Sequence, residues 1–555
     1  MDNDSTRLAR AVIDALVTGG VEHIVLCPGS RSAPLAFAAY SASVHLHTRI
    51  DERSAAFLAL GLAKGSRRPV AIITTSGTAT ANLHPAMLEA HHTGLPLIAL
   101  TADRPAELRG TNANQTTDQA GLYGSAALCA DVEVGDIEAA RAAVAAALAG
   151  QGPYQVNLQF AEPLLPGDQW SGTRPPVPPT SDWQPGPMTG PAATSSMVDS
   201  LTDRSGSDSR GGTCLPALTV VVAGDDSGPQ ARRLAQANGW PLLAEPSSGS
   251  RTGAHAIRTY RLLLEGPVWE QIEAVVVCGH PTLSRPVGNL ISRDDVPVYA
   301  VPGPLGPTDP GRVARPLPDG ARCDDPDPDW LRRWQERDQE VTAAIDAYLA
   351  GVPELTSYEV ASQVAAAVPA GGLLFVGASN SVRDLDLMMP PFPVGEHRMV
   401  MANRGLAGID GTISSAIGVA LGRPWSSRSI ALVGDVTFLH DSNGLQLGPG
   451  EERPDLTLVV VNDDGGSIFA SLEQGAPEYE AGYDKLFGTP HNVDLEALCR
   501  AHGVPHRQVH GLASLQEALA NPQGGVEMIE AVVRRDNRRA LDAALRDLGH
   551  RRPKG

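Results

Sequence analysis

Short apolar runs rich in β-branched residues alternate along the chain with longer segments whose apolar residues recur every three or four positions. The runs predict strands, for example at Val70–Thr74, Ala274–Cys278 and Leu456–Val461. Segments such as Ser357–Ala367 predict amphipathic helices. Because strands that alternate with helices assemble into parallel sheets, the pattern predicts an α/β fold.

The same rhythm divides the 555 residues into four parts. We expect a first α/β domain over 1–165, a linker over 166–213 that is disordered in part, a second domain over 214–350 and a third over 351–555. The turn after the strand at Leu218–Ala223 lacks the G-x-G-x-x-G spacing of a dinucleotide site. The second domain is therefore expected to be a spacer or a binding domain that has lost its motif.

Composition and charge exclude several classes of protein. The net charge is −19 and no basic tract occurs, which argues against nucleic-acid binding. Six scattered cysteines without C-x-x-C spacing indicate neither a disulfide framework nor a zinc site. The N-terminus lacks the pattern of a signal peptide and no run of about 18 apolar residues occurs, so we expect a cytoplasmic protein without a membrane span.

Two strand-like runs end in polar, glycine-containing turns that carry Asp435 and Asn462. Parallel strands joined by a crossover end at the same edge of a sheet, where ligands bind. A carboxylate and an amide oxygen at that edge suit a hard cation such as Mg²⁺, which also keeps phosphate oxygens in its shell. The same residues are equally ordinary turn chemistry, so this pattern alone leaves both interpretations open.

Glu52 follows a strand at the start of a helix, where a glutamate commonly just complements the helix dipole. Together with the turns at Asp435 and Asn462, however, it makes the chain resemble the thiamine-diphosphate enzymes. In those enzymes a glutamate hydrogen-bonds the aminopyrimidine ring of the cofactor, and a GDG…N motif holds the metal and the diphosphate. Here Val436 replaces the second glycine of that motif, and Asp463 replaces a second asparagine.

One branch of this superfamily shares the altered motif, namely the 2-succinyl-5-enolpyruvyl-6-hydroxy-3-cyclohexene-1-carboxylate synthases, the MenD family. Segments from Pro28 to Phe469 resemble that family in order, among them PGSRSAPL, DERSAAFLALGLAKG, TSGTATANLHPA, LTADRPAEL, FAEPL, FVGASNSVRD, NRGLAGIDG and VVNDDGGSIF. The resemblance implies three doubly wound parallel-sheet domains. The first would bind the pyrimidine of the cofactor, the second would be a middle domain, and the third would bind the diphosphate. It is weaker over the middle domain.

The resemblance also implies the cofactor site. Glu52 would be catalytic, because it would keep the pyrimidine in the imino form that removes the C2 proton. Mg²⁺ or Mn²⁺ would be held by Asp435, Asn462 and the backbone carbonyl of Asp464. The residues implied in binding thiamine diphosphate are Glu52, Ser76, Gly77, Ser379, Ile409, Gly434, Asp435, Val436, Ile468 and Phe469. For Ile409, Ile468 and Phe469, ordinary core packing is the alternative.

The implied activity is that of a carboligase-type transferase of menaquinone biosynthesis. It would decarboxylate 2-oxoglutarate, whose remaining carboxylate Arg383 and Arg404 would bind, and add the succinyl carbanion to isochorismate in a conjugate (1,4) addition. The implied isochorismate site contains Ser30, Arg31, Asn114, Gln115 and Arg285. We expect a homodimer or homotetramer with active sites between subunits.

Two alternative functions stay open at this point. The chain could be another thiamine-diphosphate-dependent 2-oxoacid decarboxylase or carboligase, or a degenerate member that only binds cofactor. Two smaller structural expectations follow from the same segments. Arg104 is expected to pair within its own domain, and a helix is expected to start at Ser76–Thr78 and to continue to about Glu89.

Overall fold

The computed structural model describes residues 3–167, 174–177 and 213–550. The described chain forms two compact units. Unit 1 contains the described residues of 1–188 together with 405–425 and 439–454, and unit 2 contains the described residues of 189–404 together with 426–438 and 455–550. The linker expected over 166–213 lies almost entirely outside the described residues.

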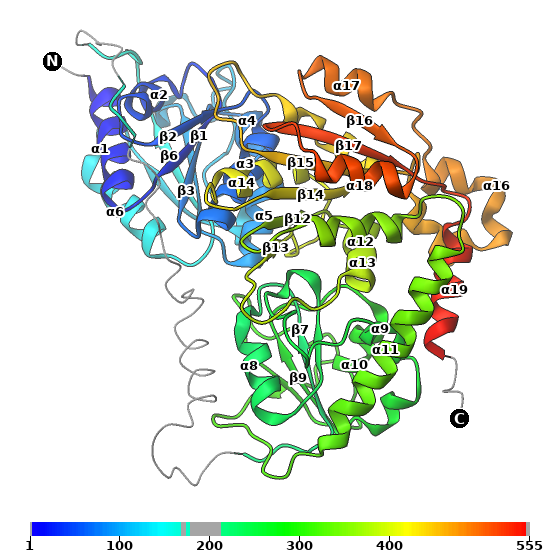
Figure 1. The fold of residues 1–555 in the computed structure, drawn as a ribbon. Coiled ribbons are helices and arrows are strands. Elements are labelled where there is room, and N and C mark those ends of the chain that lie inside the picture. The colour runs from blue at the N-terminus through cyan, green and yellow to red at the C-terminus, as the bar shows by residue number, and fades with distance from the viewer. Residues whose placement is uncertain (1–2, 168–173, 178–212, 551–555) are drawn as a thin grey trace. The chain divides into compact units, whose positions relative to one another are not determined.

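Unit 1 is built on a six-stranded parallel sheet with the strand order β2-β1-β3-β4-β6-β5. Strands β3 and β4 are wholly buried at the centre of the sheet. The strands are β1 (His23–Leu26), β2 (His45–Thr48), β3 (Val70–Thr74), β4 (Leu97–Asp103), β5 (Leu128–Val132) and β6 (Tyr154–Gln159). The helices that follow or precede them include α1 (Asp4–Thr18), α2 (Ala33–Tyr40), α3 (Glu52–Ser66) and α6 (Ile137–Ala149) (Figure 1).

The helix expected from Ser76 to about Glu89 is wrong as a single element. The structure has a short helix α4 (Thr78–Ala81) and a separate helix α5 (His84–Thr93). Pro85 lies in the first turn of α5. A proline has no N–H to bond to the preceding turn, so it is tolerated where a new helix begins but not in the middle of one.

Helices α3 and α14 (Thr412–Leu421) approach each other closely within unit 1 because glycines line their contact. A Cβ atom added at Gly61 of α3 would lie 2.2 Å from the backbone oxygen of Ser415, and one added at Gly418 of α14 would lie 2.3 Å from that of Leu58. Neither position has room for a side chain. The glycines therefore let the two helix backbones touch, which fixes the segment 405–425 against α3.

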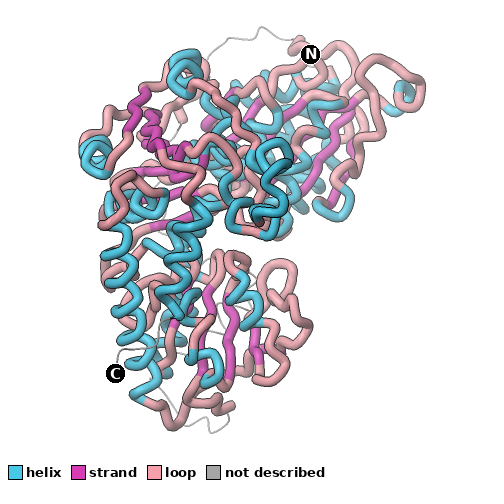
Figure 2. Tube along the Cα trace, turned by 90° about the vertical axis from the view of Figure 1, so that its right-hand side faces the viewer, coloured by secondary structure: helices cyan, strands magenta, loops and turns pink. Residues whose placement is uncertain are grey.

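Unit 2 contains two further parallel sheets (Figure 1, Figure 2). The second sheet has the order β11-β10-β9-β7-β8, and the third has the order β13-β12-β14-β15-β17-β16. The strands of the second are β7 (Thr219–Ala223), β8 (Leu242–Ala244), β9 (Ala274–Cys278), β10 (Val298–Ala300) and β11 (Arg315–Pro316). Those of the third are β12 (Leu373–Val376), β13 (Met399–Met401), β14 (Ser429–Gly434), β15 (Leu456–Asn462), β16 (His506–Val509) and β17 (Val526–Val532).

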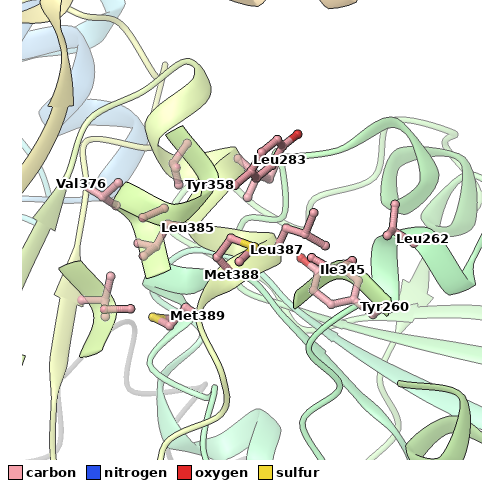
Figure 3. Close-up of a cluster of buried hydrophobic side chains, with 14 of the residues drawn as sticks. Tyr260, Leu262, Leu283, Ile345, Tyr358, Val376, Leu385, Leu387, Met388 and Met389 are labelled. Carbon is pink, nitrogen blue, oxygen red and sulfur yellow. The ribbon is translucent and has the colours of Figure 1, made fainter. Parts of the chain in front are cut away.

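One apolar core runs through both sheets of unit 2. Figure 3 shows its middle part, where Tyr260, Ile345, Leu387 and Met388 gather between the elements of the second sheet and α13 (Asn380–Met388). Other helices that pack on these sheets are α8 (Gly228–Asn238), α9 (Tyr260–Leu263), α10 (Arg285–Ile291), α11 (Pro328–Ala350), α12 (Ser357–Ala367), α17 (Leu495–Ala501), α18 (Leu512–Ala520) and α19 (Arg538–His550). The second and third sheets are thus joined by a shared interior.

The three parallel sheets confirm the predicted α/β fold class, while the proposed domain boundaries stay a prediction. Strand β14 pairs in parallel with β15, with Gly434 opposite Val461, so the turns that carry Asp435 and Asn462 do lie at the same edge. None of the described helices has both the length and the apolar sequence required to cross a membrane.

Candidate active site

The candidate residues fall into two groups, one in each compact unit. Unit 1 contains Ser30, Arg31, Glu52, Ser76, Gly77, Asn114, Gln115 and Ile409. Unit 2 contains Arg285, Ser379, Arg383, Arg404, Gly434, Asp435, Val436, Asn462, Asp464, Ile468 and Phe469.

Glu52 is the first residue of α3 and is half-buried. The helix end is capped by its neighbour, since Asp51 accepts hydrogen bonds from the backbone N–H groups of Arg53 and Ser54 at 2.9 and 3.2 Å. Asn443 in turn donates to Asp51 at 2.9 Å. Capping is therefore the task of Asp51, and Glu52 is not needed for it.

Ser76, Gly77 and Gln115 come together at the ends of β3 and β4. Ser76 donates through Oγ to the carbonyl of Gln115 at 2.9 Å, and the amide of Gln115 donates back to the carbonyl of Ser76 at 2.9 Å. Arg104 donates to Ser76 Oγ at 2.5 Å and to the carbonyl of Gln115 at 2.7 Å. Arg104 does pair within its own unit, and its partners make it part of this group.

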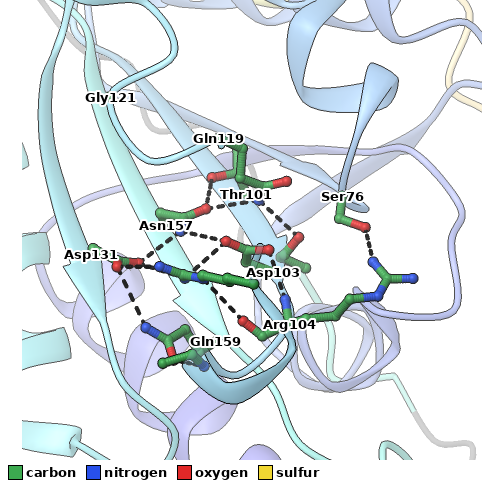
Figure 4. A network of polar contacts seen from close by, with 12 residues as sticks. Ser76, Thr101, Asp103, Arg104, Gln119, Gly121, Asp131, Asn157 and Gln159 are labelled. Carbon is green, nitrogen blue, oxygen red and sulfur yellow. Dashed lines mark hydrogen bonds and ion pairs between the residues drawn. The ribbon is translucent and has the colours of Figure 1, made fainter. Parts of the chain in front are cut away.

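A polar network inside the first sheet supports this group (Figure 4). Asn157 accepts from Thr101 and donates to Asp103 at 3.0 Å and to Asp131 at 2.7 Å. Gln119 donates to Asn157 at 2.8 Å and accepts from the backbone N–H of Gly77 at 3.1 Å. The network thus fixes the loop that carries Gln115 and connects it to Gly77.

The remaining unit 1 candidates are more loosely placed. Arg31 donates to the carbonyl of Phe160 at 2.8 Å, and burial, followed by the charge of Arg104, lowers its pKa. Ser30 and Asn114 are exposed, and Ile409 is half-buried. A cavity of about 390 Å³ in this unit is lined by some of the residues in the segment 103–120. The candidates Asn114 and Gln115 belong to that segment but do not line the cavity.

In unit 2 the candidate metal ligands Asp435, Asn462 and Asp464 surround one turn. Asp435 is buried and accepts from the backbone N–H of Gly465 at 2.9 Å. Asn462 accepts through Oδ1 from the N–H of Asp464 at 3.0 Å, while its amide nitrogen donates to Glu530 at 2.6 Å. Glu530 therefore orients the amide so that its oxygen faces the turn.

Two residues that the sequence did not suggest also hold this turn. His491 Nε2 lies 3.1 Å from Asp435 Oδ2, and its backbone N–H donates to Asp464 Oδ1 at 3.0 Å. Arg535 donates to the backbone carbonyl of Asp464 at 3.2 Å. No motif marks His491 in the sequence, because a histidine after a proline in a loop has no distinctive pattern.

The turn fits a divalent cation. Its donors are hard oxygens, and a Cβ atom added at Gly434 would meet nothing within 4 Å, so there is open space beside the turn. Burial and the nearby Asp435 raise the pKa of Asp463 to about 7, and its Oδ1 atom is buried with no partner among the described residues. Burial also raises the pKa of Asp435. A bound cation would stabilise the charged form of these buried carboxylates.

No group of three or more His, Cys, Asp or Glu side chains in the described ranges is arranged to hold a metal ion. The candidate metal ligands do not form such a group, because they are one carboxylate, one amide oxygen and one backbone carbonyl. Bound diphosphate would complete the coordination, as is usual for Mg²⁺.

The diphosphate-side candidates adjoin this turn. Ser379 directly precedes α13 and has a positive φ of 69°, which is unusual for a residue other than glycine, and its side chain makes no capping hydrogen bond. Its neighbour Asn380 donates to Ser467 at 2.9 Å, which places the α13 loop beside the segment containing Ile468 and Phe469. Backbone strain of this kind concentrates at functional sites.

Arg383 and Arg404 lie near each other. Arg404 is 3% exposed, and the pKa of Arg383 is lowered first by burial and then by the charge of Arg404. Arg285 is placed differently, since its side chain is 71% exposed and forms an ion pair with Glu473 at 2.7 Å. The structure therefore brings together two of the three candidate arginines of unit 2.

Comparisons with known proteins identify the family. Residues 6–122 match the thiamine pyrophosphate enzyme N-terminal TPP binding domain, and residues 387–530 match the C-terminal TPP binding domain. A curated relative from Nocardioides sp., named 2-succinyl-5-enolpyruvyl-6-hydroxy-3-cyclohexene-1-carboxylate synthase, is 54% identical over 98% of both chains. The chain belongs to this synthase family, the MenD family.

Other MenD family members agree over the same length. The relative of the same name from Kineococcus radiotolerans is 44% identical, over 96% of this chain and 97% of its own. The one from Saccharopolyspora erythraea is 42% identical, over 99% of this chain and 100% of its own. The resemblance seen in the sequence motifs is confirmed, and the two matched stretches contain strands β1–β4, β13–β16 and most of β17.

Proposed function

We propose that this chain catalyses the MenD family reaction. It would decarboxylate 2-oxoglutarate and add the remaining succinyl unit to isochorismate, giving 2-succinyl-5-enolpyruvyl-6-hydroxy-3-cyclohexene-1-carboxylate and CO₂ in menaquinone biosynthesis. When bound, thiamine diphosphate supplies the electron sink that both bond changes need. Asp435, Asn462 and the carbonyl of Asp464 would hold Mg²⁺ or Mn²⁺ against its diphosphate.

The observation that carries the proposed substrate is the arginine pair. Arg383 donates to the carbonyl of Ser379 at 2.8 Å, so this guanidinium sits at the loop assigned to the cofactor. Two guanidinium groups near that loop suit a substrate that keeps a carboxylate after decarboxylation. 2-Oxoglutarate has such a distal carboxylate and pyruvate does not.

The other candidates receive roles from the chemistry of their side chains. Glu52 would hydrogen-bond the protonated ring nitrogen of the aminopyrimidine and so favour its imino form, and Arg31 would bind a carboxylate of isochorismate. Ser30, Asn114 and Gln115 would hydrogen-bond the same substrate. In a complete site Glu52 would come from one subunit and the diphosphate turn from its partner, so the active form would be at least a homodimer.

This proposal is tested by incubating the purified protein with thiamine diphosphate, Mg²⁺, 2-oxoglutarate and isochorismate. We expect the absorbance of isochorismate to fall only when all components are present. No loss of isochorismate with either Mg²⁺ or Mn²⁺ would refute the proposed reaction. If pyruvate were turned over faster than 2-oxoglutarate, another 2-oxoacid decarboxylase or carboligase would be favoured instead.

A further inference from the structure

The second sheet of unit 2 lies outside both stretches that match thiamine pyrophosphate-binding domains. Its sequence suggests only a spacer or a binding domain without its motif. Nevertheless, one of its loops reaches a candidate substrate residue. Arg404 donates through Nη2 to the hydroxyl oxygen of Thr282 at 2.8 Å, and Thr282 lies in the loop between β9 and α10.

The position of Thr282 is fixed by Glu245, which follows β8. One carboxyl oxygen of Glu245 accepts the backbone N–H groups of Thr282 at 3.0 Å and of Leu283 at 2.9 Å. Glu245 is only 2% exposed, whereas Thr282 is exposed. The buried Glu245 therefore fixes the backbone of the exposed Thr282, so that the Thr282 hydroxyl has a fixed position next to Arg404.

The same sheet also contacts the second arginine of the pair. Arg261 of α9 donates to the backbone carbonyl of Arg383 at 2.7 Å and lies 3.7 Å from Asp386. Arg251 and Tyr260 donate to Asp386 at 3.0 and 2.8 Å. The apolar core around Tyr260 and Met388 backs these bonds (Figure 3). Both candidate arginines thus rest on elements of the second sheet.

Charge balance makes Glu245 a suitable support. Burial raises its pKa to about 8, although the charge of Arg404 opposes this shift. Below that pH the carboxyl is mainly neutral, so it does not cancel the positive charge of Arg383 and Arg404. The pair then remains available to an incoming carboxylate.

We propose that Thr282 and Glu245 are positioning residues, which hold the Arg404 guanidinium in place to bind the distal carboxylate of the 2-oxoglutarate substrate. This assignment rests on the proposed function. It gives the second sheet a part in substrate selection, because the chain's dicarboxylate preference would depend on a loop outside the two cofactor-binding domains. The contact is to the side chain that binds substrate and not to the cofactor.

A matched series at one position tests the proposal. Thr282→Val keeps the shape and the backbone N–H groups but removes the hydroxyl, whereas Thr282→Ser restores the hydroxyl. Thr219→Val serves as control, because it removes a hydroxyl hydrogen bond to Pro216 in the same sheet. Each holoenzyme, loaded with thiamine diphosphate and Mg²⁺, is assayed for its KM toward both substrates and for glutarate binding by calorimetry.

We expect Thr282→Val to raise the KM for 2-oxoglutarate and the Kd for glutarate about tenfold, with little change in the KM for isochorismate, in kcat or in cofactor affinity. Thr282→Ser and Thr219→Val should match the wild type. An unchanged KM in Thr282→Val, or an equal rise in Thr282→Ser or Thr219→Val, would overturn the proposal.

The two proposals can fail separately. Absence of isochorismate consumption by the wild type would refute the proposed reaction, and glutarate binding would still measure the effect of Thr282 on the arginine pair. If the wild type also failed to bind glutarate, the positioning role would be refuted as well.

Discussion

Asp51 and Glu52 are adjacent acids at the start of α3, and only Asp51 caps the helix. Asp51 accepts the first N–H groups of α3, so the helix start is satisfied without Glu52. An acid in a first helical turn also interacts favourably with the helix dipole, but Glu52 takes no part in the capping hydrogen bonds. Its carboxylate can be used for proton chemistry at the pyrimidine.

Glu52→Gln should reduce the rate of carboligation by at least about a hundredfold, because an amide cannot exchange a proton with the ring nitrogen that is protonated in the imino form. The melting temperature should stay within about a degree, since Asp51 still caps the helix. Rates come from the isochorismate assay and melting from calorimetry. Glu138→Gln changes another acid in a first helical turn, that of α6, and should leave both values unchanged. Full activity of Glu52→Gln would remove Glu52 from the catalytic site.

Glu245 should make stability depend on pH. Its pKa is about 8 in the folded protein against 4.5 for an unperturbed glutamate, and Arg404, Asp386, Asp225 and Tyr260 face it. Between these values the unfolded chain releases a proton that the folded chain keeps, so wild-type stability falls as the pH rises from about 4.5 to 8.

Glu245→Gln lacks this titration and can still accept both backbone N–H groups. The melting temperature of Glu245→Gln relative to wild type should therefore rise by a few degrees between pH 5 and pH 8, as measured by calorimetry. The exposed Glu270, in the short 3-10 helix that precedes β9, supplies the control, since Glu270→Gln should show no such trend. A constant difference across that range would mean that Glu245 is not neutral when buried.

At the scale of elements, the loop containing His491 should support metal binding. His491 lies against Asp435 and donates its backbone N–H to Asp464, two of the candidate ligands. Residues that orient metal ligands typically contribute tenfold to a hundredfold in metal affinity. His491→Ala should therefore raise the Mg²⁺ concentration needed for half-maximal binding of thiamine diphosphate by about that factor, measured by protein fluorescence.

His510→Ala provides a comparison in the same part of the chain. His510 is exposed and lies 3.1 Å from Gln508, with no contact to the metal turn. The Mg²⁺ requirement of this variant should equal that of the wild type. An identical requirement in His491→Ala would show that the loop packs on the turn without supporting the ion.

The contact between α3 and α14 makes a different prediction, about stability. Gly61→Ala would place a Cβ atom 2.2 Å from the Ser415 carbonyl oxygen, so the helices would have to separate. We expect a loss of about 1–3 kcal/mol or more in the free energy of unfolding, seen as a lower melting temperature. Gly288→Ala in α10 meets nothing within 4 Å and should be neutral or slightly stabilising. A stable Gly61→Ala protein would contradict the close contact.

The elements that the sequence predicts well are those whose signal is local. Central strands such as β3 and β9 are continuous apolar runs, and their bounds agree with the prediction to the residue. Strand β16 (His506–Val509) escaped prediction because its polar side chains carry no strand pattern, and pairing with β17 creates it. The break between α4 and α5 was not predicted either, because the composition of the whole segment is typical of a helix.

The candidate site shows the same limit. Glu52, Asp435 and Asn462 lie at or just after strand ends in recognisable motifs, so the sequence suggests them. His491, Glu530 and Thr282 reach the site only through folding, from loops and strands remote in sequence, and no local pattern marks them. Such contacts between residues far apart in the chain cannot be predicted from a single sequence.

For the whole molecule, the chain combines two thiamine pyrophosphate-binding domains with a separate parallel sheet between them in sequence. The proposed function needs each part. In that proposal the first domain would supply Glu52, the third would supply the metal turn and the arginine pair, and the second would support Arg404. If two subunits share each active site, as proposed, a monomer of this chain cannot be fully active.

The most direct test of the proposed function is the stoichiometry of the reaction. We predict that the holoenzyme releases one CO₂ from 2-oxoglutarate for each isochorismate consumed, and that omitting 2-oxoglutarate or thiamine diphosphate stops the consumption. CO₂ release that leaves isochorismate untouched, or pyruvate serving as well as 2-oxoglutarate, would contradict it.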